Sequence, residues 1–241
     1  MIDFHTHILP GVDDGSISAA ESVNMLKKLE EQGVSEVLLT PHFYAHYCNV
    51  EEFLESRESS LKKLLDALKE ESIDIKLYLG CEALYFDELW RIEKLKALCI
   101  EGTDYILVEM PFSVWPDSVV EGIERLVSRG VTPVIAHFDR YIKYKGNLEK
   151  IYRLVETGAL LQLNCSALEK FFSRIKINGF LKKGLVFAIG TDCHNLISRK
   201  PDYLAAAEYV KSRIGQQRYL RFISRQKNML RNAKIVFPAK K

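Results

Sequence analysis

The chain begins with Met1-Ile2-Asp3-Phe4-His5-Thr6-His7, an apolar run that ends in two histidines separated by one residue. Similar endings recur along the sequence, and five of its six histidines lie where a predicted strand gives way to a loop: His5, His7, His42, His137 and His194. Only His46 lies outside this pattern. Because neutral imidazole is a common metal ligand, the pattern predicts one multinuclear metal site assembled by the fold. Such sites commonly catalyse hydrolysis.

Apolar runs alternate with amphipathic helical stretches from one end of the sequence to the other. Most runs are continuously apolar, which is typical of parallel strands buried on both faces. The expected strands are 2–5, 36–40, 75–79, 105–109, 133–137, 160–164 and 186–190. The expected helices, by apolar periodicity and capping residues, are about 18–32, 51–71, 117–129, 147–157, 175–183, 202–212 and 216–232.

Seven strand–helix units favour a closed (β/α) barrel over an open sheet. In such barrels the reactive groups lie at the carboxyl ends of the strands and in the loops that follow them. The candidate ligands occupy such positions along most of the chain, whereas an open sheet would keep ligands on its two edge strands apart. We see no linker, low-complexity segment or regular repeat, so we expect a single domain over residues 1–241.

Composition and charge argue against several classes of partner. The formal net charge is +2, so no strong field attracts the chain to nucleic acid or to a membrane surface. No apolar run reaches the ~18 residues of a membrane-spanning helix. The five cysteines include no Cys-x-x-Cys pair, which is typical of reduced thiols in the cytosol. Because the first motif already includes His5, we expect no signal peptide and a cytoplasmic location.

Carboxylates complete the candidate metal site. The Asp13-Asp14-Gly15 tripeptide alone is most often a turn, but beside two histidines it offers a carboxylate donor, and we favour Asp14. Glu82 and Glu109 each follow an apolar strand, where an ionised carboxylate needs a metal ion or a salt bridge. The candidate metal ligands are His5, His7, Asp14, His42, Glu82, Glu109, His137, Asp192 and His194. One ion cannot use nine donors, but two or three ions can if carboxylates bridge them.

The chain resembles the PHP (polymerase and histidinol phosphatase) superfamily at these residues. Within it, the chain is most similar to the CpsB/CapC-type protein-tyrosine phosphatases of bacterial capsule and exopolysaccharide clusters. The resemblance covers almost the whole chain in the same order and rests on residues 1–15, 40–42, 108–111, 136–141, 162–164 and 190–195. One departure is Asp139, where the family usually has glutamate before the Arg-Tyr pair, and we expect its effect to be small.

The resemblance implies a distorted (β/α)7 barrel with three divalent ions at the carboxyl ends of its strands. Manganese is the first choice, with iron, zinc or magnesium as alternatives. The first ion would be held by His5, His7, Glu82 and Asp192. Glu82 would bridge to a second ion, completed by Glu109 and His137. The third ion would be held by Asp14, His42 and His194.

Two arginines are candidates for substrate binding because they follow ligand histidines. Arg140 lies three residues after His137, and Arg199 lies five residues after His194. The planar guanidinium suits phosphate oxygens, although a surface salt bridge is the alternative role for each. The basic stretch near the C-terminus is interpreted as a solvated helix face; its cations include Arg218, Arg221, Arg225, Lys227 and Arg231.

Aromatic residues follow two of the ligands and have two possible roles. Packing against the barrel helices is one, and flanking a phosphotyrosine ring is the other. They are Phe43, Tyr44, Tyr47, Phe112 and Trp115. Cys193 is not expected to be a nucleophile, because the glycine-rich Cys-x5-Arg loop of cysteine phosphatases is absent: Arg199 stands at that spacing, but residues 194–198 contain no glycine.

The resemblance implies hydrolysis of phosphotyrosine in proteins, on the tail of a bacterial tyrosine autokinase that controls polysaccharide export. In this reading Asp192 or His194 supplies a proton, and Arg140 acts in catalysis as well as in binding. The alternatives are a histidinol-phosphate phosphatase, an amidohydrolase or TatD-like nuclease, and a metal-binding scaffold without turnover. The oligomeric state is left open.

Overall fold

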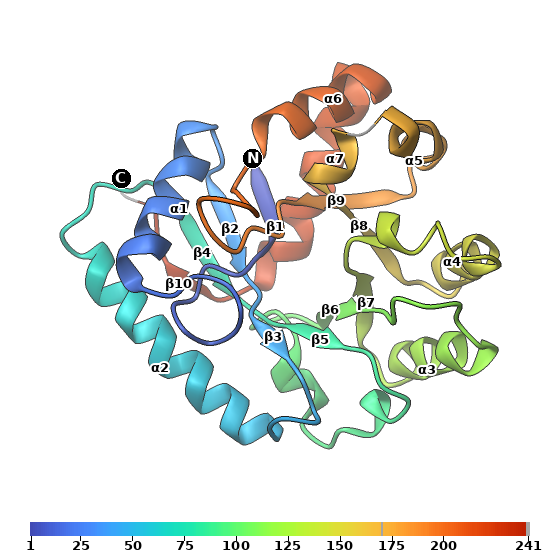
Figure 1. Cartoon of the computed structure of the whole chain (residues 1–241), viewed down its shortest axis with the longest axis horizontal. Helices are drawn as coiled ribbons and strands as arrows, with labels where there is room; N and C mark the ends of the chain where they lie inside the picture. The colour runs from blue at the N-terminus through green and yellow to red at the C-terminus, as the bar shows by residue number, and fades with distance from the viewer. Residues whose placement is uncertain (170, 240–241) are drawn as a thin grey trace.

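The computed structural model describes residues 1–169 and 171–239 of the chain. Its strands form two sheets, in the orders β1-β2-β4-β10 and β3-β5-β6-β7-β8-β9, and neighbours are parallel except for β10 (Figure 1). The strands are β1 (Ile2–Thr6), β2 (Glu36–Leu39), β3 (His42–Phe43), β4 (Lys76–Leu79), β5 (Glu82–Leu84), β6 (Tyr105–Glu109), β7 (Thr132–Ile135), β8 (Leu160–Asn164), β9 (Val186–Gly190) and β10 (Ile235–Phe237).

The two sheets are parts of one distorted barrel. Strands β2 and β3 are separated only by Thr40 and Pro41, and β4 and β5 only by Gly80 and Cys81, so each pair occupies one position in the barrel wall. On the other side, the bridge between Thr6 and Cys193 brings the end of β1 beside the residues that follow β9. The Asp192 amide also donates to the His5 carbonyl at 2.8 Å. The seven-stranded barrel that was predicted is confirmed, with β10 added antiparallel to β4.

All seven expected helices are present, with ends that shift by a few residues. They are α1 (Ala19–Glu31), α2 (Val50–Leu68), α3 (Asp117–Ser128), α4 (Asn147–Glu156), α5 (Phe171–Lys183), α6 (Leu204–Ile214) and α7 (Gln216–Met229). No helix was expected between β5 and β6, so the short helices of that segment were missed. That segment holds two 3-10 helices, η1 (Leu89–Arg91) and η2 (Leu95–Leu98), in place of an α-helix. The strands β3, β5 and β10 were also missed, because two or three residues carry no clear periodicity.

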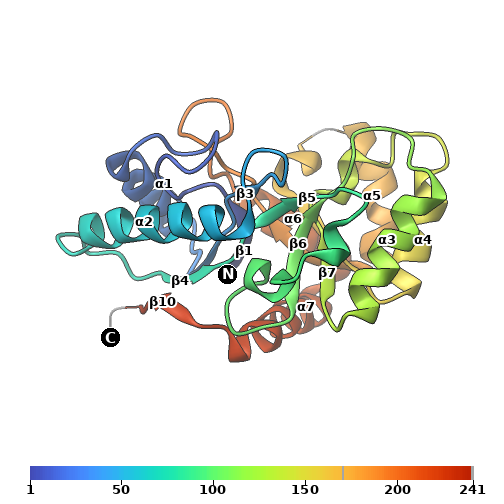
Figure 2. The same ribbon diagram turned by 90° about the horizontal axis from the view of Figure 1, so that it is seen from below.

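A small apolar cluster fills the lower part of the barrel. It takes residues from β1, β2, β4, β6, β7 and β9, and the rings of Phe4 and Phe187 meet edge to face at 6.0 Å. Met229 and Leu230, at the end of α7, complete it. Figure 2 shows α7 and β10 in the lower half of the molecule and β3 and β5 in the upper half. The carboxyl ends of the strands are therefore left for polar groups. No helix in the described part of the chain is long and apolar enough to cross a membrane.

Candidate metal centre

The nine predicted donors lie around one point at the carboxyl ends of the strands. Three groups have donor atoms within 4.8 Å of one another: His5, His7, Glu82 and Asp192; His7, Asp14, His42 and His194; and His42, Glu82 and Glu109. The ninth donor, His137, joins them because its Nε2 lies 3.0 Å from Glu82 Oε1 and 3.5 Å from Glu109 Oε1. Residues up to 189 positions apart in the sequence therefore share a single centre.

Glu82 occupies the middle of this centre. Its side chain is fully buried, and its Oε2 lies 3.0 Å from His5 Nε2, 3.3 Å from His7 Nε2 and 3.1 Å from His42 Nδ1. Its other oxygen faces His137. A carboxylate that meets four imidazoles in this way has the placement of a bridging ligand.

Hydrogen bonds on the outer side of three histidines fix the direction of their lone pairs. His5 Nδ1 faces Gln162 Oε1 at 3.2 Å, His7 Nδ1 faces Asp13 Oδ2 at 2.6 Å, and His194 Nδ1 faces the Asp192 carbonyl at 2.9 Å. Each partner accepts the Nδ1–H, so each Nε2 lone pair points into the centre. Metal-binding histidines are typically held by such outer acceptors.

Unpartnered atoms provide a test of whether the centre fits metal ions. Among the described residues, five buried side-chain atoms have no hydrogen-bond partner, and three of them are His42 Nδ1, Glu82 Oε2 and His194 Nε2. In addition, His5 Nε2 and His7 Nε2 lie only 3.0 Å apart. Buried polar atoms without partners cost free energy, and divalent cations bound among them would remove that cost. The imidazole and carboxylate donors suit transition-metal ions.

The electrostatics of the centre favour added positive charge. Burial lowers the pKa of His137, but hydrogen bonds with Glu109 and Glu82 outweigh it and raise the pKa to about 9. His7 behaves similarly: burial is outweighed by Asp13, Asp192 and Glu82, and its pKa rises well above the usual range. The carboxylates therefore favour a cation where these imidazoles meet them, and a divalent ion bound there would supply that charge.

The two predicted proton donors are better suited to binding a cation. Burial raises the pKa of Asp192, but His5, His7 and His137 outweigh it and hold the pKa well below the usual range. Burial, with the charges of His7 and Arg199, lowers the pKa of His194 to about 3. Asp192 is thus ionised and His194 neutral near neutral pH.

The adjacent aspartates of the first loop have different positions. Asp14 is 65% exposed, and its Oδ1 lies 3.4 Å from His194 Nε2 and 3.6 Å from His42 Nε2. Asp13 instead lies behind His7 and accepts the His42 amide at 2.9 Å. The loop passes so close to His7 that a Cβ at Gly15 would stand 2.2 Å from the His7 carbonyl oxygen. Asp14 thus faces the centre, and Asp13 orients a histidine, a role that the sequence analysis missed.

Both predicted phosphate-binding arginines converge beside the centre. Arg140 Nη2 donates to Asp192 Oδ2, Arg199 Nη2 lies 2.7 Å from the same carboxylate, and Asn164 Nδ2 donates to it at 3.1 Å. A cavity of about 320 Å³ opens here, lined in part by Arg140, Arg199 and Ser166. A guanidinium has five N–H donors, so an arginine that holds Asp192 retains donors for a ligand in this cavity.

Further polar residues position the donors and were not assigned roles from the sequence. Gln162 Oε1 contacts His5 and also accepts the His137 amide at 2.7 Å. The Tyr141 hydroxyl lies 3.1 Å from His137 Nδ1. His137 and Asp192 are the only non-glycine residues with positive φ in the described chain, at 30° and 55°. Backbone strain of this kind often accompanies functional sites. The sequence could have indicated a role for Gln162, because a polar side chain within a buried strand needs a hydrogen-bond partner.

The candidate aromatic residues divide between the two alternatives. Phe43 and Trp115 are buried in the core, so packing explains them. Tyr44 stacks on His42 with ring centroids 4.7 Å apart, and the partly exposed Phe112 stacks on His137 at 5.9 Å. Tyr47 is exposed. Cys193 is fully buried, and burial raises the pKa of its thiol well above the usual range, which does not suit a nucleophile.

Comparisons with known proteins agree with this geometry. The family model for capsular polysaccharide synthesis, CpsB/CapC, matches residues 1–231. The tyrosine-protein phosphatase CpsB of Streptococcus pneumoniae is 29% identical over 227 residues, which cover 90% of this chain and 93% of that protein. The tyrosine-protein phosphatase YwqE of Bacillus subtilis is 29% identical over 244 residues, which cover 98% of this chain and 93% of that protein.

Solved structures extend the comparison. Crystal structures of YwqE from Bacillus subtilis and CpsB from Streptococcus pneumoniae, described as metal-dependent tyrosine phosphatases, provide a match with a TM-score of 0.83 and 28% identity over 100% of both chains. A histidinol phosphate phosphatase from Lactococcus lactis has a TM-score of 0.57 at 13% identity, over 90% of this chain and 93% of that one, and supports the fold alone. The chain belongs to the CpsB/CapC family of capsular polysaccharide synthesis.

Proposed function

We propose that this protein is a metal-dependent protein-tyrosine phosphatase. The observation that carries the proposal is the meeting of nine metal-ligating side chains around Glu82, with two arginines directly beside them. Membership of a family whose relatives include tyrosine-protein phosphatases supports it. The physiological role proposed is control of capsule or exopolysaccharide synthesis in the cytoplasm.

We assign the nine donors to three divalent ions, with manganese as the first choice and iron, zinc or magnesium as alternatives. The first ion takes His5, His7, Glu82 and Asp192. The second takes Glu82, Glu109 and His137. The third takes Asp14, His42 and His194. Divalent ions bound here would lower the pKa of a water molecule from ~15.7 toward neutrality and draw charge from the transferring phosphoryl group.

The arginines are assigned to the phosphate. Arg140 and Arg199 reach the Asp192 carboxylate from the rim of the cavity, so their free N–H groups can take phosphate oxygens that point away from the ligands. Donors held in place before substrate arrives stabilise developing charge without reorganisation. Because Asp192 is ionised and His194 is neutral, we assign both to cation binding. A tyrosyl leaving group, with a pKa of about 10, needs only modest assistance.

The rim of the centre supports a polypeptide substrate that presents an aromatic ring. Tyr44 and Phe112 offer ring faces beside His42 and His137. Among the described residues, the three most exposed large apolar side chains, at 84%, 82% and 79%, are Ile17, Ile197 and Tyr47. They lie in the loops after β1, β9 and β3 and would contact residues on either side of a phosphotyrosine. The proposed partner is the phosphorylated tyrosine-rich tail of a bacterial autokinase.

Phosphate release tests this proposal. Manganese-supplemented protein would be given a phosphotyrosine peptide, a phosphoserine peptide and histidinol phosphate, and His137→Ala would be run beside wild type. His46→Ala, at the one histidine outside the centre, is the matched control and is expected to retain kcat. Tyrosine-selective release that His137→Ala abolishes is the expected result. Release from histidinol phosphate alone would assign the centre to a small-molecule phosphatase, and no release from any substrate would contradict catalysis.

A further inference from the structure

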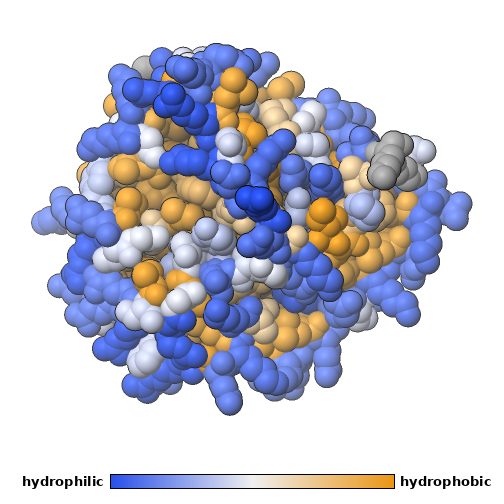
Figure 3. All heavy atoms as spheres, turned by 180° about the vertical axis from the view of Figure 1, so that it is seen from behind, coloured by the Kyte–Doolittle hydropathy of each residue, from blue (hydrophilic) through white to orange (hydrophobic). Residues whose placement is uncertain are grey.

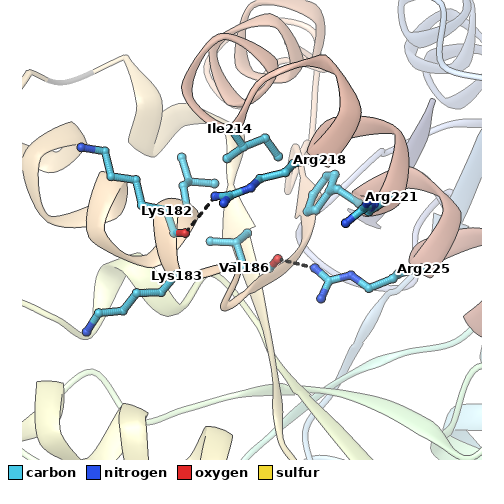
Figure 4. A pocket seen from close by; sticks show the side chains of 10 residues that line it. Lys182, Lys183, Val186, Ile214, Arg218, Arg221 and Arg225 are labelled. Atoms are coloured by element: carbon cyan, nitrogen blue, oxygen red, sulfur yellow. Dashed lines mark hydrogen bonds between the residues drawn. The ribbon is translucent and has the colours of Figure 1, made fainter.

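A second pocket lies at the opposite end of the barrel from the metal centre. It has a volume of about 350 Å³ and is bordered by the end of α5, the start of β9, the end of α6 and one face of α7 (Figure 4). From Val186 at its floor to Asp192 in the metal centre, β9 and the residues after it span roughly 20 Å at ~3.3 Å per residue. The two sites are therefore separate.

The pocket combines a cationic rim with an apolar floor. Five cations line it, while its floor includes Val186, Ile214 and Phe222. Three of the cations come from α7 and two from the end of α5: Arg218, Arg221, Arg225, Lys182 and Lys183. No aspartate or glutamate is among its described lining residues. Figure 3, which shows the face turned away from the viewer in Figure 1, has hydrophilic side chains around apolar patches.

The cations of this pocket have no ion-pair partner in the part of the chain that the structure describes. Within the described residues, no carboxylate lies within 4.0 Å of any of the five, whereas ten lysines and arginines between residues 27 and 153 pair with carboxylates. Arg218 and Arg225 instead donate to backbone carbonyls, of Lys182 at 3.4 Å and of Val186 at 3.2 Å, as Figure 4 shows. These bonds orient each guanidinium and leave its other N–H groups free.

The cations belong to a strong charge asymmetry in the chain. Residues 171–241 contain 16 lysines and arginines against 3 aspartates and glutamates, a net charge of +13, whereas residues 1–170 carry a net charge of −11. Arg218 also lies in the first turn of α7, where a cation opposes the helix dipole. Helix stability does not account for its position, so the earlier interpretation of α7 as only a solvated face is incomplete.

We propose that this pocket is a binding site for an organic phosphate. Phosphate oxygens would lie on the guanidinium groups of Arg218, Arg221 and Arg225, because arginine forks match phosphate geometry. The apolar or aromatic part of the ligand would cover Ile214, Val186 and Phe222. The pocket volume lies within the range of small-molecule sites, about 300–1,000 Å³. This binding does not depend on the phosphatase activity at the other end of the barrel.

Calorimetric titration with phenylphosphonate, which a phosphatase cannot hydrolyse, tests the proposal on manganese-loaded protein at about 0.15 M salt. Wild type is expected to bind two molecules per chain, one in each site. Arg218→Gln/Arg221→Gln/Arg225→Gln is expected to bind one, with the pocket affinity lowered at least about tenfold, and to retain kcat on a phosphotyrosine peptide. The matched control removes the same charge from exposed cations outside the pocket and is expected to bind two: Lys211→Gln/Lys227→Gln/Arg231→Gln.

Two results would overturn the site. One is a single molecule bound per wild-type chain that the pocket variant still binds with unchanged affinity. The other is equal weakening in the pocket variant and its control, which would mean general attraction to a basic surface. A third measurement tests the ligand class: inorganic phosphate is expected to bind the pocket at least about fivefold more weakly than phenylphosphonate, since it leaves the apolar floor uncovered. Equal affinities would overturn the assignment to an organic phosphate.

Discussion

One end of the barrel gathers groups that bind cations and the other gathers groups that bind anions, and the two arrangements differ in burial. At the carboxyl ends of the strands, buried imidazoles and carboxylates meet from six of the seven strand positions and point their lone pairs at one another. At the other end, exposed arginines on one helix face a shallow apolar floor. The first arrangement requires cations to satisfy buried atoms, whereas the second offers donors to an anion while water still solvates them. Substitutions in the metal centre should therefore change catalysis and stability more than substitutions in the pocket.

The largest effect is expected at Glu82. Because its two oxygens meet four histidines, Glu82→Gln should lose bound metal and lower kcat on a phosphotyrosine peptide by about 10³-fold or more, a loss of about 4 kcal/mol in transition-state stabilisation. Elemental analysis and steady-state kinetics measure both. Glu36→Gln is the matched control: Glu36 is also buried but lies in β2 and accepts from the Tyr78 hydroxyl at 2.8 Å. Equal metal loss in both variants would contradict the central role of Glu82.

A pair of glycine substitutions tests the tight packing at the buried end. A Cβ at Gly190 would stand 2.6 Å from the His5 Cβ, so Gly190→Ala should lower the free energy of unfolding by about 3 kcal/mol or more. Gly179, exposed in α5 with nothing within 4 Å of a Cβ, is the control, and Gly179→Ala should raise it by up to about 1 kcal/mol. Urea unfolding followed by circular dichroism measures both. A Gly190→Ala protein as stable as wild type would contradict the packing argument.

Removal of metal ions from the centre at the carboxyl ends of the strands should destabilise the protein. Ions that bind only the folded state stabilise it by about 2.7 kcal/mol at one hundred times the dissociation constant. Calorimetry with and without a chelator should therefore show a fall in Tm of several degrees. The fall should be similar in the triple arginine variant of the pocket, because its arginines do not touch the centre. An unchanged Tm in wild type would contradict metal binding.

A smaller effect is expected at the residues that orient the donors. Gln162→Leu removes the acceptor shared by His5 Nδ1 and the His137 amide. Loss of such an outer contact typically costs 10–100-fold in metal affinity, which competition with a fluorescent chelator can measure. The hydroxyl of Ser128, which donates to the Glu124 carbonyl on the exposed surface of α3, provides a control in Ser128→Ala. If Gln162→Leu bound metal as tightly as that control, orientation by Gln162 would be disproved.

The smallest effect on stability should come from the pocket. Its arginines are exposed and have no carboxylate partner among the described residues, so replacing all three with glutamine should change the free energy of unfolding by less than about 0.5 kcal/mol. Denaturant titration in the absence of phosphate checks this. A loss of several kcal/mol would show that the arginines serve folding, and would remove the contrast between the two ends.

The sequence alone determined the barrel and the types of group in the metal centre. Continuous apolar strands, most of them followed closely by a histidine, glutamate or aspartate, predict both without any knowledge of contacts. The carboxyl ends of parallel strands in a barrel meet at one face, so residues as distant as His5 and His194 were expected to converge. The preference for Asp14 over Asp13 was a choice between adjacent positions, and in the structure Asp14 faces His42 and His194.

Only the tertiary structure decided which groups support those donors and what the other end of the barrel presents. The contact between His5 and Gln162 joins positions 157 apart, and no local spacing specifies it. The break at Pro41 and the 3-10 helices between β5 and β6 likewise depend on neighbouring strands. The arginines of α7 appeared in the sequence as an ordinary basic helix. They line a pocket only because β9 and the ends of α5 and α6 place an apolar floor beneath them. Such a pocket is formed by segments that are distant in the sequence, so the sequence alone does not predict it.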